Sequence, residues 1–404
     1  MKLLFLAPYV YAPAYKEHSK NKTGFGFMVH DIASGVGKLG NRVVLATYAF
    51  GPKRNCQDFV IAGNKPWQNI LFGHYKGIIR FCLELKKNGA SFKDVLRGAY
   101  YHLHIGYIRH LVKKEKPDVV HIHGCTTELA VTLRMLKALG VPSVVTLHGL
   151  LQDDPGASQY QKNCERQLVK DGNTTLTVIS SKMKERLLSD YYGADNTDNV
   201  HVITNGVNMS RQDASYDIRA KHGIPADKKI ILTIGSVCAL KNQSQIARAF
   251  AMLPKELREQ YVLLFAGTIH ENAPVLQEIE TLGLTEQALC LGFVPREELC
   301  NYYSVADLTV TASVTEGFGI PMIEGFVYGV PCVAFADLDA IGDIHSDCAM
   351  LLCQTRSDEA LADTMCQALG KAWNKKEIME HSKKFSLEQM ARSYQNVYEN
   401  TLES

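Results

Sequence analysis

Short apolar runs recur along almost the whole chain and constrain its fold more than any other feature. They are rich in Val, Ile and Leu and are separated by longer segments with helical spacing: KLLFLAP, NRVVLATY, DVVHIHG, SVVTLHG, LTVISS, IILTIGS, YVLLFAG, LTVTAS and CVAFA. Runs without polar alternation are typical of parallel strands that are buried on both faces. Strands that alternate with helices predict an α/β protein with doubly wound parallel sheets, which bind ligands at the carboxyl ends of their strands.

The length of the chain predicts two domains. With 404 residues and an apolar content of 46%, the chain is long enough for two separate cores. A polar segment, MSRQDASYDIRAKHGIPADKK, precedes the strong strand IILTIGS. We therefore expect a first domain at residues 1–208 and a second at residues 209–384. The apolar spacing in residues 385–404 predicts a last helix that packs back onto another element.

Composition argues against several classes of protein. A formal net charge of +2 is too small to indicate a nucleic-acid binder. Eleven cysteines occur without a CxxC pair or a repeated metal-ligand spacing, which favours buried, reduced thiols. The apolar run before Pro8 is too short for a membrane-spanning helix and resembles a first buried strand. We expect a cytoplasmic protein.

The segment EGFGIPMIE, which follows the strand LTVTAS, predicts a phosphate-binding helix start. Gly317 and Gly319 allow backbone amides to approach a ligand, and Pro321 suits the first helical position. The free amides and the helix dipole can then hold a diphosphate. Glu316 and Glu324 border this cradle, and their carboxylates accept hydrogen bonds from sugar hydroxyls. The alternative is an ordinary strand-to-helix turn with two solvated glutamates.

Two further strand ends carry polar side chains. After IILTIG, Ser236 and Lys241 lie on a loop where a hydroxyl and an ammonium can meet a diphosphate, although an isolated lysine is usually only solvated. His148, at the end of SVVTLHG, can donate to sugar hydroxyls or simply cap its strand. His121 and His123 stay unassigned.

A glycine pair near the N-terminus suggests a second phosphate contact. Gly24 and Gly26 lie between the first strand and an apparent helix. An isolated GxG is more often a flexible turn, and the pair gains weight only from the cradle at residues 316–324.

An Asp-x-Asp pair raises the alternative of a metal-dependent enzyme. Asp337 and Asp339 follow a strand and are able to hold Mg²⁺ or Mn²⁺ against a nucleotide diphosphate. Because lysine and the helix dipole already neutralise the diphosphate, a metal is not required, and a solvated loop is the default interpretation.

Residues 75–117 form a basic segment with a net charge of +7, in which aromatic and aliphatic residues are interleaved. Such a segment can lie on an anionic membrane surface, and a solvated helix face is an equally good interpretation. Our hypothesis is peripheral contact with the inner face of a membrane.

Taken together, these motifs resemble the retaining glycosyltransferases of family 4. The resemblance rests on TGFGFMVHDIASGVGKLGNRV, VVHIHG, TLHGL, VISSKMKERL, VITNGVN, GSVCALKN, CLGFVPREELCNYYSVADLTVTAS and EGFGIPMIEGFVYGVP. It implies a GT-B fold, in which two Rossmann-like domains face each other across a cleft. The first domain then binds mainly the acceptor and the second mainly the nucleotide sugar, and the last helix returns to the first domain. Residues from about 50 to 115 carry none of the resemblance.

The resemblance also implies roles for single residues. Glu324 is expected to hold the ribose, Glu316 the donor sugar and Lys241 the diphosphate, while His148 faces the reacting sugar. Backbone contacts are implied for the following positions: Gly317, Phe318, Gly319 and Ile320 to the donor, Phe293 and Val294 to the base, and Gly26 to phosphate. Many members have Arg where this chain has Ser236, so one guanidinium contact to the diphosphate is missing.

The implied reaction is sugar transfer with retention and without a metal or other cofactor. The donor is a nucleotide sugar, with a UDP-sugar expected over a GDP-sugar, and the acceptor is a glycan, glycolipid or protein, as in bacterial-type surface polysaccharide assembly. A non-hydrolysing sugar-nucleotide epimerase of the same architecture and a non-catalytic sugar-nucleotide binding subunit are the alternatives. The sequence alone fixes neither base nor sugar.

Overall fold

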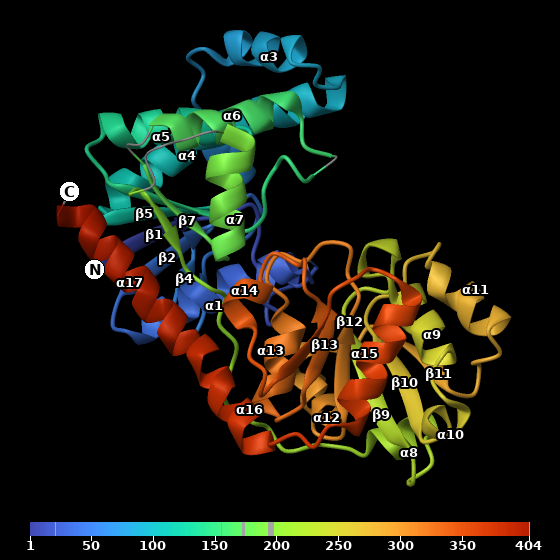
Figure 1. Cartoon of the computed structure of the whole chain (residues 1–404). Helices are drawn as coiled ribbons and strands as arrows, with labels where there is room; N and C mark the ends of the chain where they lie inside the picture. The colour runs from blue at the N-terminus through green and yellow to red at the C-terminus, as the bar shows by residue number, and fades with distance from the viewer. Residues whose placement is uncertain (21, 155, 172–173, 193–197, 404) are drawn as a thin grey trace. The chain divides into compact units, whose positions relative to one another are not determined.

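The computed structural model describes the chain except for residues 21, 155, 172–173, 193–197 and 404. The chain divides into two compact units, one formed by Met1–Asn205 with Leu387–Ser404 and the other by Gly206–Ser386 (Figure 1). Val207 donates its backbone N–H to the carbonyl of Phe385 at 2.8 Å. The two ends of the second unit therefore lie side by side.

The first unit is built on a sheet of eight described strands in the order β3-β4-β2-β1-β5-β6-β7-β8. All neighbours pair in parallel except β3 and β4, which pair antiparallel. The strands are β1 (Lys2–Leu6), β2 (Arg42–Ala46), β3 (Arg54–Asn55), β4 (Val60–Ile61), β5 (Val119–His123), β6 (Ser143–Leu147), β7 (Thr175–Val178) and β8 (Val200–Val202). Because β2 and β5 flank β1, the strand order reverses at β1, and the loops after these strands diverge there.

Most helices of this unit cover the sheet, whereas α3 (Ile78–Lys87) packs on α4 (Phe92–Glu115) away from it (Figure 1). The other helices before β8 are α1 (Gly24–Lys38), α2 (Pro66–Leu71), α5 (Leu129–Ala138), α6 (Gln159–Asp171) and α7 (Ser181–Glu185), with the 3₁₀ turn η1 (Lys16–His18) and the π-helix η2 (Arg186–Tyr192). Side-chain caps begin several of them, as where the Thr23 hydroxyl accepts from the N–H of Gly26. The core includes the apolar strand residues predicted from the sequence, such as Leu4, Phe5 and Val145, together with the inner faces of the helices.

The last helix, α17 (Leu387–Glu403), belongs to the first unit and packs on α1, β5 and β6. At Gly35 of α1, a Cβ atom would lie 3.0 Å from the Cβ of Ala391, so the absent side chain lets the two helices approach closely. Tyr398 of α17 is fully buried and its hydroxyl hydrogen-bonds with Nδ1 of His121 at 2.8 Å. Nε2 of His121 hydrogen-bonds with the Thr146 hydroxyl. His121 is therefore a structural residue that joins α17 to the sheet.

The second unit contains a sheet of six described strands, all parallel, in the order β11-β10-β9-β12-β13-β14. The strands are β9 (Lys229–Ile234), β10 (Tyr261–Ala266), β11 (Ala288–Gly292), β12 (Leu308–Thr311), β13 (Cys332–Phe335) and β14 (Met350–Cys353). Its strand order reverses at β9, between β10 and β12. Parallel sheets with both faces covered explain the continuous apolar runs of the sequence.

The helices of the second unit include one that begins directly after the segment SVTEGFG. They are α8 (Ile218–His222), α9 (Gln243–Ala251), α10 (Lys255–Arg258), α11 (Pro274–Thr281), α12 (Leu299–Tyr303), α13 (Ile320–Val327), α14 (Ile341–Ile344), α15 (Asp358–Gly370) and α16 (Lys375–Ser382), with the 3₁₀ turns η3 (Ala239–Lys241), η4 (Arg296–Glu298) and η5 (Lys383–Phe385).

The prediction of two parallel-sheet α/β domains is confirmed. The nine runs expected to be strands all form strands, whereas β3, β4, β8, β11 and β14 were not among those runs. Among the described residues, the helices lack a stretch that is both long and apolar enough to cross a membrane.

Replacing Tyr398 by Phe should destabilise the first unit by about 1–3 kcal/mol, because it leaves the buried Nδ1 of His121 without its partner. Chemical denaturation followed by circular dichroism measures this loss. Asn396→Ala, on the exposed side of the same helix, is the matched control and should change the free energy of unfolding by less than about 0.5 kcal/mol. Equal stability of the Phe variant and the parent would contradict the structural role of His121.

Candidate functional site

Lys241 and Glu316 meet at the point where the strand order of the second sheet reverses. Lys241 follows β9 and Glu316 follows the neighbouring strand β12. The Lys241 ammonium forms a short ion pair with the Glu316 carboxylate, and the side chains are only 25% and 14% exposed. The Ser313 hydroxyl donates to the same carboxylate at 3.0 Å. Two predicted site residues that are far apart in the sequence are thus in direct contact.

The start of α13 forms one wall of this site. Gly319 is the residue before the helix and has a φ of 75°. A Cβ atom there would lie 2.0 Å from the end of the Met322 side chain, so both backbone and space require glycine. Lys241, Ser313, Glu316, Gly319 and Pro321 line one small pocket of about 10 Å³, which is room for about one water molecule. The backbone at the start of α13, the Lys241 ammonium and the Glu316 carboxylate therefore line the same pocket.

Arg356, which sequence reasoning missed, holds the loop that carries Glu316. Its guanidinium donates to the carbonyls of Ser313 and Val314 at 3.0 and 3.3 Å and binds both carboxylate oxygens of Asp337 at 2.7 and 2.9 Å. It also lies over the Phe335 ring. A fork of this kind fixes both partners in orientation. Asp337, the first acid of the Asp-x-Asp pair, is therefore engaged by an arginine.

Glu324 lies one turn further along α13 and has two partners from other elements. It accepts a hydrogen bond from the buried Tyr303 hydroxyl at 3.1 Å and pairs with Arg296 at 3.6 Å. Tyr303 shares its proton with the carbonyl of Pro321 at 3.0 Å. Burial, with the Glu324 charge adding to it, raises the pKa of Tyr303 well above its usual value. Arg296 follows β11, so it connects Glu324 to the segment where the base was predicted to bind.

The other predicted donor contacts lie around the same sheet edge. Ser236 follows β9, and its carbonyl accepts from the buried Gln243 side chain at 2.9 Å. The Phe318 side chain is 3% exposed and packs near Phe385, so only its backbone can face a ligand. Val294 packs against the core of the second unit. The first residue of α13 is Ile320, preceded directly by Gly317, Phe318 and Gly319.

In the first unit, His148 lies beside His123 and Phe25. Nδ1 of His123 and Nε2 of His148 are 3.1 Å apart, and the Phe25 ring meets His148 edge-on. Burial lowers the pKa of His148 to about 4. Burial, with the two neighbouring histidines adding to it, also holds the pKa of His123 well below its usual value. The pair is therefore uncharged at neutral pH and can exchange hydrogen bonds with a neutral hydroxyl.

Gly26 lies in the first turn of α1, and its N–H already donates to the Thr23 hydroxyl at 3.2 Å. Its carbonyl accepts from the N–H of Tyr11 at 3.1 Å. A phosphate contact at this amide would have to compete with the helix cap, so Gly26 is less open to a ligand than the sequence suggested.

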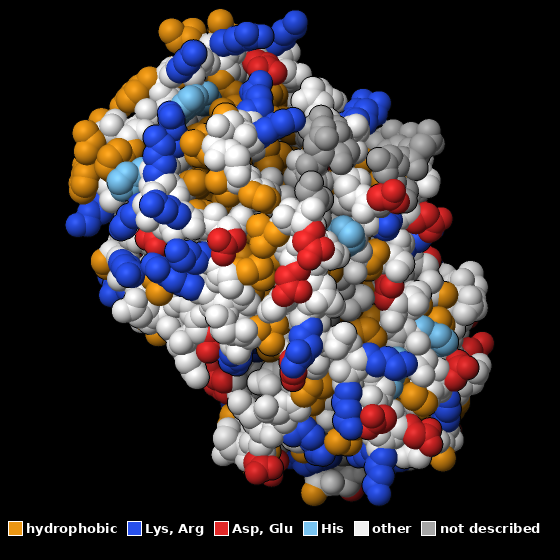
Figure 2. All heavy atoms as spheres, turned by 90° about the vertical axis from the view of Figure 1, so that its left-hand side faces the viewer, with side chains coloured by type: hydrophobic (Ala, Val, Ile, Leu, Met, Phe, Trp, Pro, Cys, Tyr) orange, Lys and Arg blue, Asp and Glu red, His pale blue; other side chains and the backbone are white. Residues whose placement is uncertain are grey.

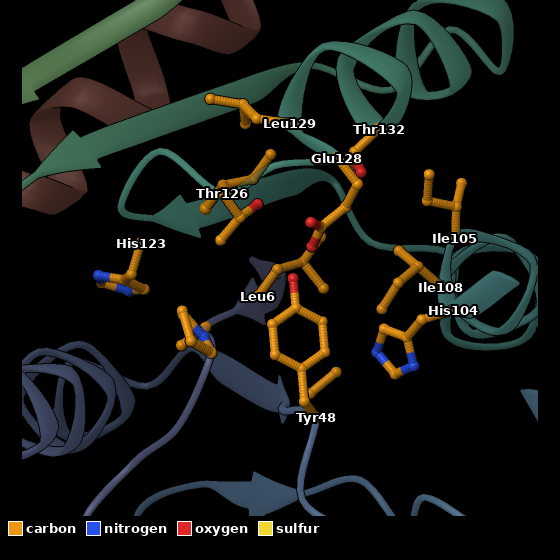
Figure 3. A pocket seen from close by; sticks show the side chains of 14 residues that line it. Leu6, Tyr48, His104, Ile105, Ile108, His123, Thr126, Glu128, Leu129 and Thr132 are labelled. Carbon is orange, nitrogen blue, oxygen red and sulfur yellow. The ribbon is translucent and has the colours of Figure 1, made fainter. Parts of the chain in front are cut away.

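A second pocket lies where the strand order of the first sheet reverses (Figure 3). It has a volume of about 30 Å³ and is lined from the ends of β1, β2 and β5 and from α4 and α5. Its most unusual member is Glu128, which is 5% exposed and has an Oε2 atom without a hydrogen-bond partner among the described residues. Burial raises the pKa of Glu128 to about 8. Sequence reasoning gave no signal for Glu128.

Glu128 should make the stability of the first unit pH-dependent. Because its pKa is about 8 in the folded protein against 4.5 as the ordinary value, the folded state holds a proton that the unfolded state releases. The stability that protonated Glu128 adds to the folded state is fully present below pH 4.5 and is lost as the pH rises through 8. The free energy of unfolding falls by a few kcal/mol over this range. Urea denaturation at a series of pH values should show this loss in the parent protein and a flatter profile in Glu128→Gln. Identical profiles would contradict the buried acid.

Comparisons with known proteins agree with this architecture. Residues 23–211 match the profile described as "Glycosyltransferase Family 4", and residues 215–385 match the profile described as "Glycosyl transferases group 1". The two profiles together span most of the chain.

Curated relatives include a D-inositol 3-phosphate glycosyltransferase of Xylanimonas cellulosilytica, which is 29% identical over 54% of this chain and 55% of its own length. An alpha-monoglucosyldiacylglycerol synthase of Acholeplasma laidlawii is 25% identical over 57% of this chain and 61% of its own length. The chain thus matches little more than half the length of these two relatives.

Solved structures with the same fold include a sucrose-phosphate synthase from Thermosynechococcus elongatus, with a TM-score of 0.75, 18% identity and 99% of each chain covered. Anabaena HepE in complex with UDP and glucose has a TM-score of 0.70 at 18% identity, covering 99% of this chain and 100% of its own. The profiles, the relatives and the fold lead to one conclusion: the chain belongs to glycosyltransferase family 4.

Proposed function

We propose that this protein transfers a sugar from a nucleotide diphosphate sugar to a hydroxyl group of an acceptor, with retention and without a metal. The observation that carries the proposal is the contact of Lys241 with Glu316 beside the start of α13. An ammonium and free helix amides are the groups that bind a diphosphate, and the carboxylate is suited to the hydroxyls of the attached sugar.

The chemistry of transfer fits this arrangement. The bond between the anomeric carbon and the diphosphate breaks, and the acceptor oxygen forms a new bond on the same face. The acceptor proton passes to the departing diphosphate oxygen. Negative charge grows on the diphosphate as its bond breaks, so Lys241 and the start of α13 stabilise the transition state more than the bound donor.

The ion pair bears on how Lys241 is held in the protein. Glu316 neutralises Lys241, which lowers the cost of holding an ammonium in a half-buried position. A diphosphate would compete with Glu316 for Lys241 and free the carboxylate for the sugar. Glu324, held by Tyr303 and Arg296, is then placed for the ribose, and the backbone near Val294 for the base.

Two observations support transfer without a metal. Asp337 is bound through both oxygens to Arg356, which also holds the loop before Glu316, so it is committed to positioning. Lys241 and the helix start supply positive charge that a metal would otherwise supply. The neutral His148 fits a site that contacts sugar hydroxyls without adding a charge.

The comparisons favour UDP as the donor nucleotide and a glycan or glycolipid as the acceptor. HepE was crystallised with UDP and glucose, and the Acholeplasma laidlawii relative is a synthase of a glucosyl diacylglycerol. We therefore place the protein in surface glycan, polysaccharide or glycolipid assembly, with a UDP-sugar as the expected donor.

Lys241→Ala and Glu316→Ala should each lower sugar transfer by two or more orders of magnitude, because each removes a group that acts on the donor. Release of UDP from a panel of UDP-sugars, with glycan or glycolipid acceptors present, measures transfer, and thermal shift with UDP, GDP and ADP measures nucleotide binding. Lys241→Ala should also weaken stabilisation by UDP. Lys255→Ala, at a side chain that is 73% exposed, is the matched control and should behave like the parent.

Two results would contradict this assignment. Near-normal turnover in either Lys241→Ala or Glu316→Ala would remove these residues from the mechanism. Conversion of the nucleotide sugar alone into an isomeric nucleotide sugar would favour the epimerase alternative, because a transferase yields at most slow hydrolysis without an acceptor.

A membrane-facing surface of the first unit fits a lipid-linked acceptor. The apolar-basic face, as we call it, consists of exposed side chains between residues 67 and 97. Its large apolar members are Trp67, Ile70, Leu71, Tyr75, Ile79, Leu83, Phe92 and Leu96. Its exposed cations are Lys76, Arg80, Lys86, Lys87, Lys93 and Arg97. Figure 2 shows hydrophobic and basic side chains mixed at the top of the molecule, where α3 lies in Figure 1.

The packing of α3 explains why this face stays apolar. Phe81 and Leu85 point inward and pack with Tyr160 and Cys164 of α6. Ile79 and Leu83, which are 75% and 63% exposed, therefore contribute nothing to that core. Exposed apolar side chains interspersed with cations match the interface of an anionic bilayer. The cations at the far end of α4 lie about 30 Å along the helix and are not needed for this surface.

The double variant Ile79→Ser with Leu83→Ser should lose most binding to vesicles of phosphatidylglycerol, because it removes the apolar groups that insert. Co-sedimentation at low salt measures the bound fraction. Leu276→Ser, an exposed leucine of the second unit, is the matched control and should bind like the parent. If the parent fails to sediment with these vesicles, or binds neutral phosphatidylcholine equally well, the apolar-basic face is not a membrane surface.

A further inference from the structure

The pocket around Glu128 takes no part in the donor chemistry described above. Glu128 lies immediately before α5, yet its side chain does not cap that helix. Its Oε2 atom is buried and lacks a hydrogen-bond partner among the described residues. A buried polar atom left without a partner costs free energy, and such atoms persist where a ligand or a water completes them. An unexplained acid of this kind at the carboxyl edge of a parallel sheet indicates a binding site.

The side chains around Glu128 define the chemistry of the missing partner. The pocket lining contains no lysine or arginine, so nothing in it would bind a phosphate or carboxylate. Tyr48, Thr126 and Thr132 add hydroxyls, and Ile105 and Ile108 add an apolar wall. In Figure 3 the Glu128 carboxyl group and the Tyr48 hydroxyl both point into the middle of the pocket. Groups that both donate and accept hydrogen bonds, next to apolar carbon, suit an uncharged hydroxyl-bearing ligand.

The size of the pocket limits how much of a ligand enters it. The volume of about 30 Å³ is three times that of the pocket beside Lys241 and has room for about two or three water molecules, which is enough for a hydroxyl or hydroxymethyl group and too small for a sugar ring. The pocket therefore receives one arm of a larger molecule.

The position of the pocket relates it to the predicted reacting centre. His123 lines the pocket and its Nδ1 lies 3.1 Å from Nε2 of His148. His123 therefore lies between a hydroxyl arm bound by Glu128 and His148, the histidine that is expected to face the reacting sugar. The donor groups Lys241 and Glu316 belong to the other unit. A ligand held here by the first unit is the acceptor rather than the donor.

We propose that Glu128 forms an acceptor subsite, in which its carboxyl group hydrogen-bonds with a hydroxyl or hydroxymethyl arm of an uncharged sugar or polyol. This inference rests on the proposed transferase function and narrows its acceptor to a molecule with such a neutral arm. Burial keeps the carboxyl protonated at neutral pH, so it both donates and accepts. Glu128 then helps to decide which acceptors bind.

Saturation-transfer NMR with four probes tests the subsite: D-glucose, N-acetylglucosamine, myo-inositol and glycerol, each with UDP present. Glu128→Gln keeps a donor and an acceptor in nearly the same shape and should bind the preferred probe within about threefold of the parent. Glu128→Leu fills the same space without polar atoms and should bind it about tenfold or more weakly. Glu399→Leu, on an exposed part of α17, is the matched control and should bind like the parent.

Thermal shift with UDP separates this inference from the transferase proposal. UDP should stabilise the parent and all three variants equally, because Glu128 does not contact the donor. Parent-like probe binding by Glu128→Leu would overturn the subsite. Failure of every probe to bind the parent, while UDP still stabilises it, would also overturn the subsite and leave the transferase proposal standing. Loss of UDP stabilisation in the parent would instead count against the proposed function itself.

Discussion

The reversal of strand order at one strand of each sheet is the constraint on which the rest of the structure depends. At β1 and at β9 the chain leaves the sheet in opposite directions, so the loops after adjacent strands separate and leave space at the carboxyl edge. Glu128 and His148 lie near this point in the first unit, and Lys241 and Glu316 lie there in the second. Buried Val, Ile and Leu side chains form the interior of the sheets. The polar groups lie in the loops that follow the strand ends.

In the second unit, the groups at this edge hold one another in place. Arg356 fixes the carbonyls of the loop before Glu316, Gly319 gives the turn that opens α13, and Lys241 is held by the carboxylate itself. Groups fixed in place in this way need little rearrangement when charge develops, which is the basis of electrostatic catalysis. Each charge named here has an opposite partner, which lowers the cost of holding these charges at the sheet edge.

The two sheets could be predicted from the sequence, because apolar runs buried on both faces leave a clear signal. That Lys241, Glu316 and Gly319 lie together could also be predicted, because each follows the end of a predicted strand. Their roles toward a donor stay predictions. Very short strands such as β3 and β4 carry too few residues for a pattern. Arg356 and Glu128 were missed for another reason: each lies outside a motif, and its meaning depends on partners brought together by folding. His121, left unassigned, is bound to Tyr398 from the far end of the chain, a contact that no local pattern reveals.

The hydrogen bond between Val207 and Phe385 joins the two ends of the second unit's chain segment, where it leaves and re-enters the first unit. A segment whose two ends are neighbours can be replaced as a whole domain, because it is attached to the rest of the fold at only two adjacent points. The first unit is completed by a helix that follows this segment, so its own architecture is preserved whatever the segment contains. Such connectivity lets the two units diversify independently of each other.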